Sequence, residues 1–212
     1  MRVHLVRLGA ISTMVTAVLF LGFGVTPWLL LPIDASLLEW VQDPQWVVLN
    51  VAALVMALLL PLTLVALYAA QAESLGTVGL ASFVLAFLGS LLYVGLQFDE
   101  TFVWPILAKE SPSLLALQGP MFSDPGFVSI YLAMGVFFIL GWIVFGIATY
   151  RARVLSRSGA ALLAVGMAVF GAGNMVPIVV RGLGSVAASV ALALLARSLW
   201  RWSALPVRST LA

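Results

Sequence analysis

Six long apolar runs constrain the fold of this 212-residue chain more strongly than any other feature. An α-helix needs roughly 20 apolar residues to cross a bilayer core of about 30 Å, since each residue adds about 1.5 Å. In lipid, the backbone polar groups of one segment can pair with each other only in a helix. The predicted transmembrane helices span residues 8–31, 46–70, 76–97, 127–150, 159–178 and 182–200.

The composition leaves little room for a water-soluble fold. The chain is 63% hydrophobic and 8% charged, whereas soluble domains carry roughly 25% charged residues. Too few polar groups remain to cover the apolar surface with a hydrated shell. We therefore predict an all-α, polytopic membrane helical bundle, built as a single domain over residues 1–212.

The charges between the runs sort by sign, and this predicts the orientation. With six spans both termini share one side, which holds eight of the ten basic residues: Arg2, Arg7, Arg151, Arg153, Arg157, Arg197, Arg201 and Arg208. The other side holds seven of the eight acidic residues: Asp34, Glu39, Asp43, Asp99, Glu100, Glu110 and Asp124. The positive-inside rule places the arginine side, and therefore both termini, in the cytoplasm.

Polar residues gather at the outer ends of the predicted spans. They are Asn50, Tyr93, Gln97, Asp99, Glu100, Asn174 and Arg181. Arg181 is a cation on an acidic side, so we expect it to pair with Asp99 or Glu100. If these ends converge, they form a ligand-binding pocket for a small amphiphile, with its headgroup at Arg181. The alternative is that these groups only join helices through hydrogen bonds and one structural salt bridge.

Several classes of chemistry lack the residues they need. The chain has no cysteine, and its one histidine, His4, lies in the predicted cytoplasmic tail. Thiolate sites, bis-histidine haem sites and histidine-carboxylate metal sites at membrane depth are therefore excluded. We assign no catalytic residue, no metal and no cofactor. A net charge of +2 is too small to indicate a nucleic-acid partner.

Two further patterns concern packing and the membrane surface. Small residues recur every four positions along three spans: Ser82, Ala86 and Ser90; Ala160, Ala164, Ala168 and Ala172; Ser185, Ser189 and Ala193. Such stripes let helices approach closely, either within the bundle, which we favour, or across a homodimer. The arginines of the fourth predicted loop, Arg151, Arg153 and Arg157, are placed to contact anionic lipid headgroups.

The external segment 98–126 contains Pro105, Pro112, Pro120 and Pro125, which rule out one continuous helix. It is also apolar, with stretches such as 102–107 and 114–117. A solvated linker would be more polar. We expect this segment to lie on the bilayer surface or to fold back over the bundle as a lid.

Three stretches resemble a diffuse group of small six-span bacterial membrane proteins. They are the sequence from Leu67 to Glu73, Phe98-Asp-Glu-Thr-Phe-Val-Trp-Pro105, and the sequence from Phe145 to Leu155. The resemblance covers most of the chain and implies a location in the bacterial inner membrane. It implies no activity, and no functional residue can be carried over.

These patterns favour a non-enzymatic membrane protein that binds or transports a small hydrophobic or amphiphilic molecule. An accessory or structural subunit of a larger membrane complex is the main alternative. A membrane enzyme that depends on carboxylates is the second alternative, and it requires Asp99 and Glu100 to face a cleft in the bundle.

Overall fold

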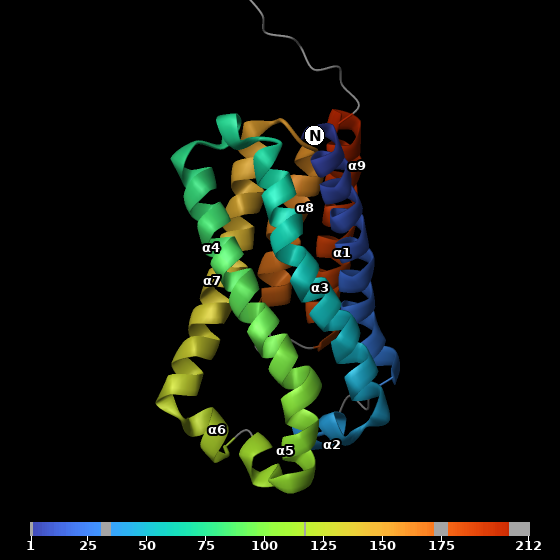
Figure 1. The fold of residues 1–212 in the computed structure, drawn as a ribbon, viewed down its shortest axis with the longest axis vertical. Helices are drawn as coiled ribbons and strands as arrows, with labels where there is room; N and C mark the ends of the chain where they lie inside the picture. Colours follow the sequence, from blue (N-terminus) through green and yellow to red (C-terminus); the bar gives the residue numbers. More distant parts are fainter. Residues whose placement is uncertain (1, 31–34, 117, 172–177, 204–212) are drawn as a thin grey trace, which may run out of the picture.

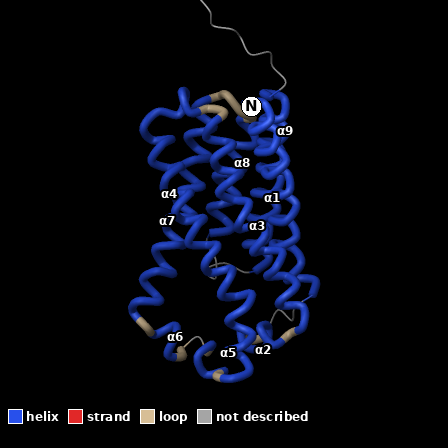
Figure 2. The backbone as a smooth tube through the Cα atoms, in the orientation of Figure 1, coloured by secondary structure: helices blue, strands red, loops and turns tan. Residues whose placement is uncertain are grey.

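The computed structural model describes residues 2–30, 35–116, 118–171 and 178–203. Within these residues every regular element is helical, so the predicted all-α class is confirmed. Six helices build the bundle: α1 (Arg2–Leu30), α3 (Pro44–Ala69), α4 (Ala72–Phe98), α7 (Pro125–Ala152), α8 (Arg157–Gly171) and α9 (Ile178–Ser203). Short helices join α1 to α3 and α4 to α7, and the tube in Figure 2 shows in tan the loops that separate other helices.

The six helices form a closed ring in chain order. Each one packs against the helix before it and the helix after it, and α9 closes the ring by packing along α1. Figure 1 shows the start of α1 and the end of α9 at the same end of the bundle, which we call the terminal end. The opposite end is covered by short helices, and we call it the capped end.

Five segments are long and apolar enough to cross a membrane. They are Val6–Thr26, Pro44–Ala69, Ala72–Glu110, Pro125–Ala152 and Val179–Ser203. The chain is thus a multi-pass membrane protein by length and composition. Helix α8 matches the predicted span 159–178, but its 15 residues reach only about 22 Å. Residues 172–177 lie outside the described part of the chain, and the sixth span stays a prediction.

The ring encloses an aromatic and aliphatic core. Trp142, Phe145 and Phe20 are almost fully buried in it, and Phe20 packs edge-to-face against Phe170 of α8 with ring centroids 5.1 Å apart. The outer surface instead exposes large aliphatic side chains such as Val48 and Ile130. A bundle that is apolar both in its core and on its outer surface is suited to being surrounded by lipid.

Small residues bring the helix backbones into contact around the ring. A Cβ atom added at Gly141 of α7 would collide with the backbone of Ala86 of α4, and one at Gly89 would collide with the backbone of Phe138. On α8, a Cβ at Gly166 would meet the backbone of Ala188 of α9 in the same way. The described small residues of the predicted stripes, other than the exposed Ala168, lie wholly or partly buried in the bundle. This supports the packing interpretation of the stripes.

The turn between α3 and α4 depends on one glycine. Gly76 has φ 62°, a conformation that residues with a side chain rarely adopt. It separates a short first turn of α4 from the long straight part, which therefore starts where the sequence predicted the third span to start. Nearby, the amide of Gln71 donates to the hydroxyl of Thr149 at 2.8 Å and joins this turn to α7.

The external segment 98–126 is largely helical rather than an open loop. Helix α4 continues through a π-helical turn, η1 (Asp99–Val103), into α5 (Trp104–Glu110), followed by the 3-10 turn η2 (Pro112–Leu115) and α6 (Pro120–Ser123). Each of its prolines lies in the first turn of a helix, where the missing N–H costs nothing. Pro112, Pro120 and Pro125 therefore begin new helices, whereas Pro105 follows directly on the π-helical turn of a continuous helical segment.

These short helices fold back onto α2 (Leu37–Gln42) and the start of α3. Together these elements form a lid with its own apolar core. Trp46 and Trp104 stack in this core, with ring centroids 6.2 Å apart and planes 11° apart. The side-chain amide of Gln42 donates to the carbonyl of Ala108 and ties α2 to α5. In Figure 1 this lid lies at the capped end of the bundle. A lid was one of the two arrangements that we expected for this segment from the sequence.

Helix α2 of the lid starts with a capping box. The backbone N–H and the hydroxyl of Ser36 both donate to the carboxylate of Glu39, and the Ser36 hydroxyl accepts from the Glu39 backbone N–H. The backbone hydrogen bond, followed by the hydroxyl, holds the pKa of Glu39 below its ordinary value. This residue therefore stabilises the helix start as a carboxylate.

We predict that Gly141→Ala destabilises the bundle by about 1–3 kcal/mol, because the new methyl group must push α7 away from α4. The matched control is Gly135→Ala on the same helix, where an added Cβ meets nothing within 4 Å. SDS denaturation in mixed micelles measures both free energies of unfolding. Equal stability of the two variants would contradict close packing at the α4–α7 crossing.

Candidate ligand site at the capped end

The candidate site is built around the π-helical turn η1 that ends the straight part of α4. Such turns are rare and occur frequently at functional sites. The hydroxyl of Thr101 donates to the carbonyl of Gln97 at 2.5 Å, which satisfies a carbonyl in the widened turn. The indole N–H of Trp46 donates to the backbone carbonyl of Glu100 at 2.7 Å. The turn is thus fixed both to its own helix and to α3.

Gln97 and Glu100 form the polar centre of the site. The Gln97 side chain is 1% exposed, and its amide N–H donates to the Glu100 carboxylate at 2.5 Å. The other end of the same amide, Oε1, is buried and has no hydrogen-bond partner among the described residues. A buried carbonyl without a donor costs free energy of about 1–3 kcal/mol. The site therefore has the capacity to accept a hydrogen bond from a ligand.

Arg181 supplies the positive charge of the site. It lies half-buried in the first turn of α9, close enough to interact electrostatically with Glu100 and with the phenol groups of Tyr93 and Tyr131. Tyr93 is buried one turn before Gln97, and its ring packs on Phe138 with centroids 5.0 Å apart. Groups from α4, η1, α7 and α9 thus converge here.

The predicted site residues divide into two groups. Tyr93, Gln97, Glu100 and Arg181 come together as described above, and Asp99 is half-buried within electrostatic range of Glu100. Asn50 is buried, but its amide donates to the carbonyl of Trp46 in its own helix at 2.9 Å. It therefore acts one turn away from the site, by supporting the start of α3. Asn174 lies outside the described residues.

Sequence reasoning missed three contributors. Tyr131 of α7 interacts with Glu100 and Arg181, and it stacks on Phe127. Trp46 and Thr101 hold the η1 turn through the hydrogen bonds given above. Aromatic residues are common at membrane interfaces whether or not they bind anything. The sequence therefore gave no sign that Trp46 or Tyr131 has a polar partner.

The three arginines predicted to meet lipid headgroups lie together at the terminal end. Arg151 ends α7, Arg153 is the left-handed residue that closes this helix with φ 58°, and Arg157 starts α8. All three are exposed, and the Arg157 guanidinium lies over the Tyr150 ring at 4.4 Å. Their contact with lipid stays a prediction.

The capped-end site combines several kinds of polar group. A carboxylate, a guanidinium, an amide and two phenols offer both donors and acceptors at the end of an apolar bundle. A ligand with a small polar head and an apolar body matches this combination. Comparison of the chain with protein-family models, with curated proteins and with solved structures finds no match. The arrangement of the site is therefore the basis for any functional assignment.

We predict that Trp46→Phe destabilises the protein by about 1 kcal/mol, since it removes the hydrogen bond to the Glu100 carbonyl and keeps an aromatic ring against Trp104. Thermal unfolding in detergent measures the effect. Trp200→Phe is the control, because Trp200 is half exposed and its indole N–H makes no hydrogen bond among the described residues. A loss of stability of the same size in both variants would show that the η1 turn does not depend on this bond.

Proposed function

We propose that this chain is a non-enzymatic bacterial inner-membrane protein with six spans and cytoplasmic termini, which binds or transports a small amphiphilic molecule at its outward-facing end. The observation that carries the proposal is the buried amide of Gln97. It donates to Glu100 and retains an acceptor oxygen without a partner in the described residues.

The proposed orientation rests on the separation of charge between the two ends. The terminal end holds the arginines that close α7, start α8 and end α9. The capped end holds acidic residues of α2, η1 and α5, including Glu39, Asp99 and Glu110. Arginine-rich ends remain in the cytoplasm, so the cap would face outward.

The chemistry of the site indicates the ligand class. Arg181 favours an anionic or carbonyl group, while the free oxygen of Gln97 and the Glu100 carboxylate favour a hydroxyl or an amine. The apolar residues of α4 and α7 beside the site, such as Phe138 next to Tyr93, suit a hydrocarbon or aromatic body. The lid would then cover the bound molecule on its outer side.

The two alternatives make different demands on the same residues. A subunit of a larger complex needs an exposed contact face, yet the small residues Ser185 and Ser189 of α9 are buried, and Ser189 donates to the Ala17 carbonyl of α1. A carboxylate enzyme needs a reacting group beside Glu100, whose carboxylate already accepts from Gln97. These contacts favour ligand binding over both alternatives.

The proposed topology can be tested because the chain contains no cysteine. We expect Ser113→Cys, exposed in the lid, to react with a membrane-impermeant maleimide in intact spheroplasts. Ser158→Cys, exposed at the start of α8, should react only after the membrane is permeabilised. The reverse pattern would place the lid in the cytoplasm, and labelling of both positions in intact spheroplasts would mean that they do not lie on opposite sides.

Ligand binding is tested by native mass spectrometry of the protein, extracted gently so that small molecules are retained. We expect a non-lipid adduct on the wild-type protein that is reduced at least tenfold in Arg181→Gln and in Gln97→Leu. A tenfold loss corresponds to about 1.4 kcal/mol, close to the lower end of the roughly 1.5–3 kcal/mol that one hydrogen bond to a charged group contributes.

The matched control is Arg153→Gln, which removes an exposed arginine at the opposite end. It should keep the adduct, and thermal unfolding should show that all variants fold. A protein without any adduct, or with an adduct that survives both site substitutions, would remove the support for a ligand site. An assembly with other chains and no adduct would favour the subunit alternative.

A further inference from the structure

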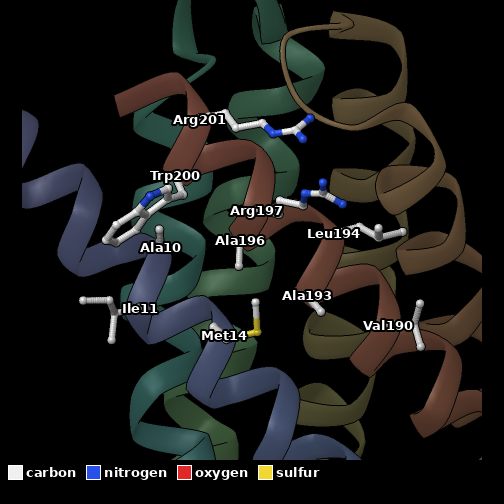
Figure 3. Close-up of a pocket in the computed structure, with 10 residues that line it drawn as sticks. All are labelled: Ala10, Ile11, Met14, Val190, Ala193, Leu194, Ala196, Arg197, Trp200 and Arg201. Carbon is white, nitrogen blue, oxygen red and sulfur yellow. The ribbon is translucent and has the colours of Figure 1, made fainter. Parts of the chain in front are cut away.

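A groove runs along the outside of the bundle between α1 and α9, at the terminal end and far from the site described above (Figure 3). Its volume is about 730 Å³. Alanines form its floor, with Ala10 and Ala196 buried and Ala193 half-buried. Larger apolar side chains rise on both sides, such as Ile11 of α1 and Leu194 of α9. The groove is hollow because small residues line its base.

The length of the groove matches one leaflet of a bilayer. Its lining on α9 runs from Val190 to Arg201, a distance of 11 residues or about 16 Å along the helix. Half of the hydrocarbon core measures about 15 Å. An acyl chain lying in the groove would thus extend from the membrane surface to the bilayer centre, with its polar end beside the arginines.

Two arginines stand at the upper end of the groove. Figure 3 shows Arg197 and Arg201 extending in the same direction from successive turns of α9. Both are exposed, and within the described residues neither guanidinium has a hydrogen bond, an ion pair or an aromatic partner. Guanidinium groups bind phosphate oxygens through paired N–H donors. Two of them one turn apart form a site for a phosphate group.

Trp200 marks the depth at which this site lies. Its ring lines the groove on the side of α1 and is held beneath the Arg7 guanidinium, 5.7 Å from the ring centroid. Tryptophan is most stable at the level of lipid headgroups. The polar end of the groove is therefore at the membrane interface, where a phospholipid carries its phosphate.

We propose that the groove between α1 and α9 holds one anionic phospholipid of the leaflet at the terminal end, with its phosphate between Arg197 and Arg201 and an acyl chain over Ala193. The charge at the groove end favours this occupant over a second copy of the chain. A second copy would bring its own arginines to the same end, where they would repel Arg197 and Arg201. A zwitterionic lipid would gain less from the two cations.

The test is native mass spectrometry of the full chain from nanodiscs containing equal amounts of phosphatidylglycerol and phosphatidylcholine with identical acyl chains. We expect the wild-type protein to retain phosphatidylglycerol preferentially. The double variant Arg197→Gln/Arg201→Gln should bind it roughly 25-fold more weakly, a factor of about five for each arginine. Ala193→Leu keeps both arginines and fills the groove, and should also release the lipid.

Two controls separate the groove from the general surface. Arg151→Gln/Arg153→Gln removes the same charge at the same end, and Ala168→Leu adds the same volume on the exposed face of α8. Ala168→Leu should retain the lipid as the wild-type protein does, and Arg151→Gln/Arg153→Gln should lose much less of it than the groove variants, since any headgroup at these two arginines lies outside the groove. Equal retention of the two lipids by the wild-type protein would overturn the proposal, as would equal losses in groove and control variants. A dimer that Ala193→Leu dissociates would identify a second copy as the occupant.

The two proposals fail independently of each other. Arg181→Gln should remove the non-lipid adduct at the capped end and leave phosphatidylglycerol bound. The double arginine variant at positions 197 and 201 should do the opposite. A phospholipid lost from both sets of variants would mean that the bundle as a whole, and no defined groove, retains lipid.

Discussion

The close approach of helix backbones at small residues is the constraint on which this structure depends. In lipid, an apolar side chain gains little by leaving its surroundings, so helices associate mainly through tight packing and hydrogen bonds. Gly89 and Gly141 let α4 and α7 meet backbone to backbone, and Gly166 does the same between α8 and α9. Buried hydroxyls add cross-links, such as the 3.1 Å contact between Thr16 and Thr63. The large core residues then fill the space that this ring leaves.

The bounds of the long helices could be predicted closely, because hydropathy shows where an apolar run lies and bilayer thickness sets how long it must be. The observed α3, α4 and α7 begin and end within a few residues of the predicted spans. The segment 98–126 was harder, because a proline that interrupts one helix can equally begin the next. Pro105 and Pro120 lie in the first turns of α5 and α6. The contact between Trp104 and Phe122 in the lid core favours this arrangement of the short helices. Tertiary contacts of this kind leave no local pattern in the sequence.

The capped-end site was partly predictable for a different reason. Arg181 violates the charge rule, and a polar residue in an unfavourable place needs a partner, so its interaction with Glu100 could be expected. The π-helical turn could not be expected, since the residues from Asp99 to Val103 carry no pattern that distinguishes it from an ordinary helix. This extra residue per turn accompanies the side-chain contact between Gln97 and Glu100 and the backbone contact with Trp46. The geometry of the site thus arises from a local irregularity.

The two ends of the molecule use polar residues in opposite ways. At the capped end the lid core encloses Trp46 and Trp104, and the neighbouring buried amide of Gln97 donates to Glu100 while its oxygen has no partner among the described residues. At the terminal end Arg197 and Arg201 point outward beside an apolar groove, where lipid headgroups are the nearest source of negative charge. A buried polar group must find its partner inside the fold, whereas an interfacial cation can take its partner from the membrane. A ligand at the first end would therefore have to enter the fold to reach the unpartnered oxygen of Gln97, whereas a lipid at the second end would reach Arg197 and Arg201 from the membrane.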